Sequence, residues 1–105
     1  MVFQRQGKFD AAVEAFQQSA EIEERLGNQR GEAMVLNSLG GVYQRQGRFH
    51  EAVRVLQQSA GIEDLLGNQP GLAMVLNSLG GVFQRQGKFM TQSMLSSAAT
   101  KSLTA

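Results

Sequence analysis

The chain repeats itself with a period of forty residues, and this repetition limits its possible folds more than any other feature. When residues 2–41 are aligned with residues 42–81, 28 of the 40 paired positions are identical. Residues 82–89 then match residues 2–9 at all eight positions. A fixed period near forty is typical of stacked helical pairs and of propeller blades. The chain is therefore expected to fold as an array of similar units.

The spacing of apolar residues within one period indicates two helices. The first stripe has intervals of three and four residues and consists of Leu36, Leu39, Gly40 and Tyr43. Gly47 is predicted to end this helix, and a second apolar stripe occupies residues 49–66. Gly67 suits a left-handed stop, and Asn68 with Pro70 suits the capped start of the next helix. Each period is thus predicted to be a pair of helices, each about 16 to 18 residues long.

Two glycines, Gly40 and Gly80, are predicted to lie inside helices. Glycine costs about 1 kcal/mol relative to alanine at such a position, so its presence needs a reason. We expect close packing, in which the backbone at Gly40 approaches Ala52 of the second helix. A phosphate-binding loop is the alternative. It is disfavoured because the segment follows no strand and lacks the spacing of known glycine-rich nucleotide motifs.

Composition restricts the classes of function. The chain has no cysteine, so it can form neither a disulfide nor a thiolate metal site. No segment approaches the roughly 20 apolar residues of a membrane span, and no secretion signal is present, so we expect a cytoplasmic protein without a membrane partner. The formal net charge of +1 gives no field that would attract nucleic acid.

Residues that carry catalysis are not grouped in this sequence. His50 is the single histidine, and no carboxylate cluster stands at metal-ligand spacing to it. Glu21, Glu23 and Glu24 lie beside Arg25 and are expected to form an exposed, ion-paired helix flank. We therefore expect no enzyme activity, no cofactor and no metal site.

One string of residues resembles the tetratricopeptide repeat family over residues 1–89. It places leucine-glycine, aromatic, glycine, aromatic and alanine at fixed offsets, in Leu39-Gly40, Tyr43, Gly47, Phe49 and Ala52. The forty-residue period is longer than the usual 34 and is similar to that of kinesin light chains and bacterial multi-repeat proteins. The resemblance implies an all-α fold of antiparallel helix-turn-helix repeats, stacked as a short right-handed solenoid, and it implies protein binding.

In this family the first helix of each pair lines a concave groove that receives an extended peptide or a partner helix. The side chains that point away from the apolar stripe map this groove onto Arg5, Met34, Asn37, Ser38, Gln44, Arg45, Met74, Asn77, Ser78, Gln84 and Arg85. Stacking is expected to set the two asparagines side by side and the arginines in a row, which suits a carboxylate-bearing peptide. Each arginine alone is also explained as a favourable charge at a helix C-terminus. The asparagines favour the groove, because asparagine forms helices poorly.

The ends of the chain depart from the repeat. We divide the array into a partial repeat at 1–28, a full repeat at 29–68 and a partial repeat at 69–89, with an N-terminus that truncates the first helix. Gln92 and Ser96 stand at the positions of Ala52 and Leu56, so helix pairing is expected to fail there. Residues 90–105 form a Ser/Thr-rich tail, predicted to be a weak helix or disordered. A one-base loss in the coding DNA near Phe89 is one hypothesis for the change.

Three functions are compatible with the sequence. A protein-interaction scaffold agrees best with the resemblance. The second is a structural or self-assembling fragment, in which open ends carrying Val2, Phe3, Val82 and Phe83 associate. Nucleic-acid binding through the arginines is the third and agrees poorly with the net charge. Dependence of the mass on concentration separates the first two, and salt dependence of binding separates the third.

Overall fold

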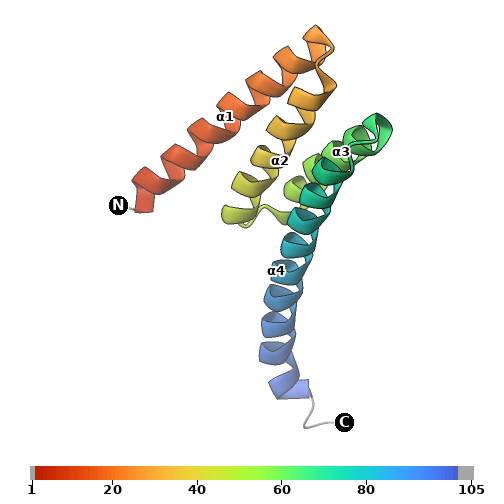
Figure 1. Ribbon diagram of the computed structural model, residues 1–105. Helices are drawn as coiled ribbons and strands as arrows, with labels where there is room; N and C mark the ends of the chain where they lie inside the picture. The colour runs from red at the N-terminus through yellow and green to blue at the C-terminus, as the bar shows by residue number, and fades with distance from the viewer. Residues whose placement is uncertain (1, 102–105) are drawn as a thin grey trace.

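Four α-helices make up this computed structural model, which describes the backbone of residues 2–101 and the side chains of residues 7–87. They are α1 (Val2–Leu26), α2 (Gln29–Arg45), α3 (Phe49–Leu66) and α4 (Gln69–Lys101) (Figure 1). No strand occurs among the residues whose backbone is described. The prediction of an all-α fold is therefore confirmed.

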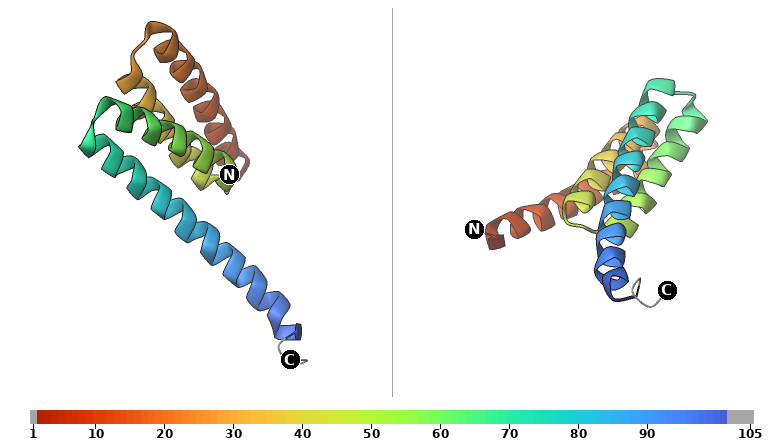
Figure 2. Two further views of the ribbon diagram at one scale, coloured as in Figure 1. Left: turned by 90° about the vertical axis from the view of Figure 1, so that its right-hand side faces the viewer. Right: turned by 90° about the horizontal axis from the view of Figure 1, so that it is seen from below.

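Consecutive helices run antiparallel and pack side by side, α1 on α2, α2 on α3 and α3 on α4 (Figure 1). A smaller contact joins α2 to α4, so these two helices lie beside each other on α3. The molecule measures 59 × 36 × 17 Å, and α4 projects well beyond the other helices (Figure 2). This arrangement is a short helical solenoid, as the repeat predicted.

The core lies where α2 meets its two neighbours, and α4 closes it. Both predicted stripes supply it, although the second stripe ends early, because Leu66 is exposed. Val82, which we predicted to be an exposed end residue, is instead fully buried because α4 packs onto α3. The buried apolar residues are Val13, Ala33, Leu36, Leu39, Val42, Tyr43, Ala52, Val55, Leu56, Val75, Leu79 and Val82.

The predicted stops and starts of the central helices are confirmed. Gly47 and Gly67 have φ values of 75° and 68°, in the left-handed region that glycine adopts most easily. Asn68 accepts a hydrogen bond from the Gly71 N–H at 3.3 Å, which satisfies a free donor in the first turn of α4. Pro70 lies in that same turn, where its missing N–H leaves no bond unmade.

The helical glycines Gly40 and Gly80 behave differently from each other. Gly40 is buried, and a Cβ atom built on it would lie 2.5 Å from Leu56 Cγ. Close packing is therefore confirmed at Gly40, with Leu56 as the nearest neighbour and not Ala52. At Gly80 the same expectation is wrong, because no atom of the described residues lies within 4 Å of a Cβ there.

The two helices at the ends of the chain are longer than the two central helices. Helices α2 and α3 have 17 and 18 residues, as predicted. Helices α1 and α4 have 25 and 33 residues, because each continues through the glycine that is equivalent to Gly47. No helix in the described part of the chain is long and apolar enough to cross a membrane.

Candidate functional site

The turn between α3 and α4 builds the floor of the candidate site. Asn68 Nδ2 donates a hydrogen bond to Glu63 Oε2 at 3.0 Å. A Cβ atom at Gly71 would overlap this carboxylate, so only glycine lets Glu63 lie against the start of α4. The positive end of the helix dipole stabilises a negative charge at that place. Glu63 is thereby fixed in the interior, with 4% of its surface exposed.

The turn between α1 and α2 has the same construction. Asn28 Nδ2 donates to Glu23 Oε2 at 2.7 Å, and Asn28 Oδ1 accepts from the Gly31 N–H at 3.2 Å. This finding corrects the predicted ion-paired flank, because Glu23 bonds to the turn and not to Arg25. The salt bridge found among residues 7–87 joins Arg48 to Glu51 elsewhere. The hydrogen-bonded turn therefore belongs to the repeat unit itself.

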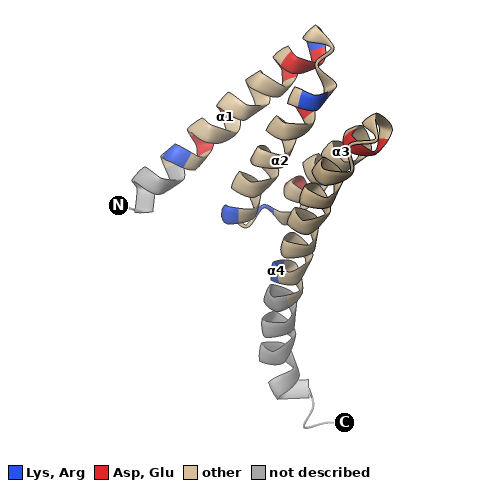
Figure 3. Ribbon diagram, in the orientation of Figure 1, with Lys and Arg blue, Asp and Glu red and all other residues tan. Residues whose placement is uncertain are grey.

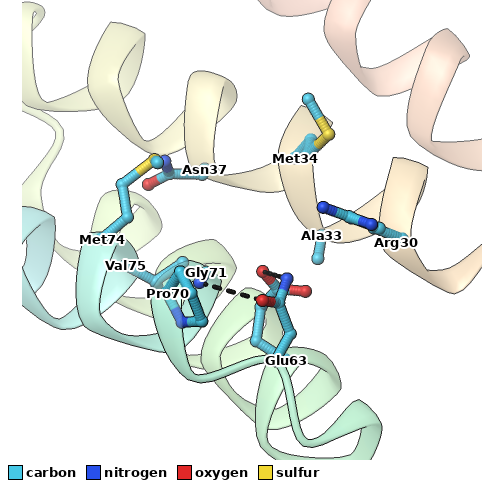
Figure 4. Close-up of a pocket in the computed structure, with 10 residues that line it drawn as sticks. Arg30, Ala33, Met34, Asn37, Glu63, Pro70, Gly71, Met74 and Val75 are labelled. Atoms are coloured by element: carbon cyan, nitrogen blue, oxygen red, sulfur yellow. Dashed lines mark hydrogen bonds between the residues drawn. The ribbon is translucent and has the colours of Figure 1, made fainter.

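A cavity of about 220 Å³ opens above this floor, between α2 and α4 (Figure 4). Met34 and Met74 flank it from the two helices, and both side chains are largely exposed. Asn37 reaches into it beside Met74 in the view of Figure 4. The residues that line the cavity are Arg30, Ala33, Met34, Asn37, Glu63, Asn68, Pro70, Gly71, Met74 and Val75.

Two of the residues that line this cavity carry a side-chain oxygen without a hydrogen-bond partner. Asn37 Oδ1 and Glu63 Oε1 are buried, and neither has a partner among the described residues. A buried acceptor without a partner costs about 1 to 3 kcal/mol. The cavity therefore has an apolar rim, and two of its lining residues each hold an unpaired acceptor.

Three of the predicted groove residues meet at this cavity, namely Met34, Asn37 and Met74. Ser38 and Arg45 instead line a second cavity of about 490 Å³ between α1 and α2. Arg5 lies outside the residues whose side chains are described. The remaining predicted residues line neither of these two cavities: Gln44, Asn77, Ser78, Gln84 and Arg85.

The polar residues of the predicted groove differ in exposure from one repeat to the next. Asn77 is exposed, whereas Asn37 is half-buried. Ser38 and Ser78 donate their hydroxyl protons to the carbonyls of Met34 and Met74 at 3.2 Å, four residues earlier on their own helices. Figure 3 shows acidic residues near the C-terminal ends of α1 and α3 and basic residues around the α2–α3 turn.

Sequence reasoning missed the residues that the inter-helix turn contributes. It followed one face of the first helix, whereas the floor comes from the end of α3 and the first turns of α2 and α4. A signal was present, since glutamate follows isoleucine near the end of the second helix in both repeats, at Glu23 and Glu63, five residues before asparagine. The lining residues outside the prediction are Arg30, Ala33, Glu63, Asn68, Pro70, Gly71 and Val75.

One buried carboxyl near this site has a shifted pKa. Burial raises the pKa of Glu32, and the nearby negative charge of Glu24 raises it further. Within the described residues, no three side chains of histidine, cysteine, aspartate or glutamate are grouped so as to hold a metal ion.

Comparison with known proteins agrees with this architecture. A protein-family model described as tetratricopeptide repeat matches residues 1–62, which include α1, α2 and most of α3. A search of curated proteins finds no match to the chain. The matched segment covers more than half of the 105 residues and contains the hairpin around Gly47. The chain therefore belongs to the tetratricopeptide repeat family.

Proposed function

We propose that this chain is a protein-interaction scaffold that binds an extended peptide, or one face of a partner helix, in the cavity between α2 and α4. The family match supports the general role, since tetratricopeptide repeats commonly mediate binding between proteins. The cavity supports the place. At about 220 Å³ it is smaller than the roughly 300 to 1,000 Å³ of drug-sized sites, so it has room for one side chain of a longer ligand.

The observation that carries the proposal is the pairing of apolar rim and unsatisfied acceptors. Met34 and Met74 give a flexible apolar rim, which adapts to side chains of different shape. Asn37 Oδ1 and Glu63 Oε1 each lack a donor among the described residues. A peptide that places an apolar side chain between the methionines brings its own backbone N–H groups to this level.

The charge of the cavity refines the ligand further. Arg30 is the arginine among the lining residues, so a carboxylate on the peptide would meet Arg30 at this cavity. We therefore favour a ligand with an acidic residue close to its apolar anchor.

A peptide-display selection against the folded chain tests this function, followed by fluorescence anisotropy with a selected peptide. Asn37→Ala should weaken binding by about tenfold, as expected for loss of one central polar contact. Asn77→Ala is the matched control, because it removes the equivalent amide one repeat later, at an exposed position outside the cavity. Equal losses in the two variants, or none in Asn37→Ala, would rule out this cavity as the binding site.

A second function, self-assembly through open helix faces, is favoured by a different observation. Leu76 and Phe83 lie on α4 with about half of their surface exposed. Aromatic and leucine side chains at this density on one helix face mark an association surface. The internal repeat indicates that this surface binds a second copy of the chain.

A further inference from the structure

The exposed face of α4 repeats a face of α2 that is already buried. Leu36 and Tyr43 on α2 are 5% and 2% exposed, because α2 packs between α1 and α3. Their equivalents one period later, Leu76 and Phe83 on α4, are 53% and 51% exposed. Gly80 lies between them, one period after Gly40, and no described atom lies within 4 Å of the position that its Cβ would take. The α4 face therefore carries one half of an interface without the other.

A face of α1 carries the complementary half. On α3, Ala52 and Leu56 are 0% exposed because α2 covers them. Their equivalents on α1, Ala12 and Phe16, remain partly exposed. Both line the cavity of about 490 Å³ between α1 and α2, together with Gly41 of α2. Relative to α1, this cavity lies where α2 lies relative to α3.

We propose that α4 of one copy docks into the cavity between α1 and α2 of a second copy. The occupant is a second copy because the chain already contains this interface, between α2 and α3, with nearly the same residues on both sides. The proposal concerns surfaces other than the Asn37 cavity, and it holds or fails independently of peptide binding.

The internal interface fixes the register of docking. Gly40 lies against Leu56 inside the molecule, so Gly80 of one copy is placed against Phe16 of the next. The absent Cβ at Gly80 leaves space for the larger phenylalanine ring. Within one molecule, a Cβ at Gly81 of α4 would lie 3.6 Å from Gln44 Nε2 of α2. The docked α4 takes the place of α2 in this pair, so its Gln84 is placed beside Gly41 of the second copy.

This contact joins different surfaces of the two copies, so it does not close on itself. Each added copy leaves one open α4 and one open α1, and the solenoid continues from copy to copy with two repeats in each. The mass should therefore rise continuously with concentration and should not stop at a dimer.

Two substitutions block the two halves separately. Gly80→Glu places a charged side chain on the α4 face, at a position where the single molecule has open space. Ala12→Glu places one on the α1 face. The matched control is Gly61→Ala, also helical and exposed with nothing within 4 Å, but on the part of α3 outside both faces. Circular dichroism verifies that each variant is folded.

Analytical ultracentrifugation over a hundredfold range of concentration provides the readout. The unmodified chain and Gly61→Ala should grow in mass, and each blocked variant should stay a monomer, with association weakened at least tenfold. An equimolar mixture of Gly80→Glu and Ala12→Glu should form a dimer and nothing larger, since one intact α4 face meets one intact α1 face.

Three results would overturn the proposal. The unmodified chain could remain monomeric at all concentrations. Ala12→Glu could continue to associate, which would indicate contact between two α4 faces. The mixture could stay monomeric although both variants are folded. Anisotropy of a selected peptide with monomeric Gly80→Glu measures groove binding separately from all of these results.

Discussion

The same six-residue motif takes two conformations in this molecule. At residues 44–49, Gln-Arg-Gln-Gly-Arg-Phe, the chain leaves α2 and turns at Gly47, with φ at 75°. At residues 84–89, Gln-Arg-Gln-Gly-Lys-Phe, it stays helical within α4. The two motifs differ at one position, where Arg48 is replaced by Lys88, and both side chains are positively charged. Local sequence therefore permits the turn and does not impose it.

The neighbourhood of the motif decides between the two conformations. Beyond Gly47, the chain returns as α3 and buries Ala52 and Leu56 completely. The turn also gains the Arg48 N–H bond to the Tyr43 carbonyl at 2.8 Å and the Arg48 guanidinium over the Tyr43 ring at 4.6 Å. Beyond Gly87 the sequence offers glutamine and serine at the matching positions, so a return would bury little apolar surface. Continuing the helix then keeps its backbone hydrogen bonds.

The largest effect should come from giving α3 the residues of the α4 extension. Ala52→Gln with Leu56→Ser removes the apolar face that covers α2 and introduces polar groups into the core. Leucine loss alone costs about 2 to 5 kcal/mol, and the pair should approach the whole stability of a small domain. Chemical denaturation followed by circular dichroism should lose its cooperative transition. A variant that unfolds as cooperatively as the unmodified chain would show that side-chain burial does not hold the turn.

Alanine at the two equivalent packing glycines should have opposite effects. Gly40→Ala forces Leu56 to move and should lower the free energy of unfolding by about 1 to 3 kcal/mol. Gly80→Ala meets open space and should raise it by up to about 1 kcal/mol through helix propensity. Denaturation is measured at concentrations where both variants are monomeric. The same sign for both would contradict the difference in packing.

Alanine at the two motif glycines sharpens the comparison directly. Gly47→Ala places a side chain at positive φ and should cost about 1 to 2 kcal/mol. Gly87→Ala lies in a continuous helix, with no described atom within 4 Å, and should gain up to about 1 kcal/mol. Thermal unfolding of the two variants gives the comparison. A loss of stability in Gly87→Ala would mean that this copy also turns in solution.

A smaller effect distinguishes the buried hydroxyl of α3 from its equivalent on α1. Ser59 is fully buried and donates a hydrogen bond to the Ala33 carbonyl of α2 at 2.7 Å. Ser59→Ala should therefore cost about 1 kcal/mol. Ser19→Ala, at the partly exposed equivalent, should be neutral within about 0.5 kcal/mol. Equal losses, measured by urea denaturation, would contradict this assignment.

The smallest effect concerns Glu32. Because its pKa is raised in the folded state, its contribution to stability is present below the ordinary glutamate pKa of about 4.3 and is lost as pH rises through the raised value. Glu32→Gln should therefore be slightly more stable than the unmodified chain at pH 7, within about 0.5 kcal/mol, and this advantage should shrink toward pH 4. Glu14→Gln, at an exposed position, is the control for the pH series.

The elements that could be predicted from the sequence are those for which the local residue pattern and the tertiary packing favour the same structure. The left-handed stop at Gly67 and the cap at Asn68 were predictable because each depends on one residue type at one position. The stripe through Leu36 and Tyr43 was predictable from the spacing of apolar residues along one helix. The continuous α1 and α4 were not predictable from the motif, since the same letters also form a turn. Glu63 was missed for another reason: a buried carboxylate depends on bonds to a turn that follows it in the chain.

The turn that holds Glu63 has a consequence for how recognition could change during evolution. Its hydrogen bonds close within residues 63–71, so none of these bonds involves a residue elsewhere in the chain. Insertion of one more forty-residue unit by recombination between its near-identical copies would add a complete junction and leave the existing ones unaltered. The length of ligand that such a protein reads would then grow in whole steps, one anchoring side chain for each inserted unit.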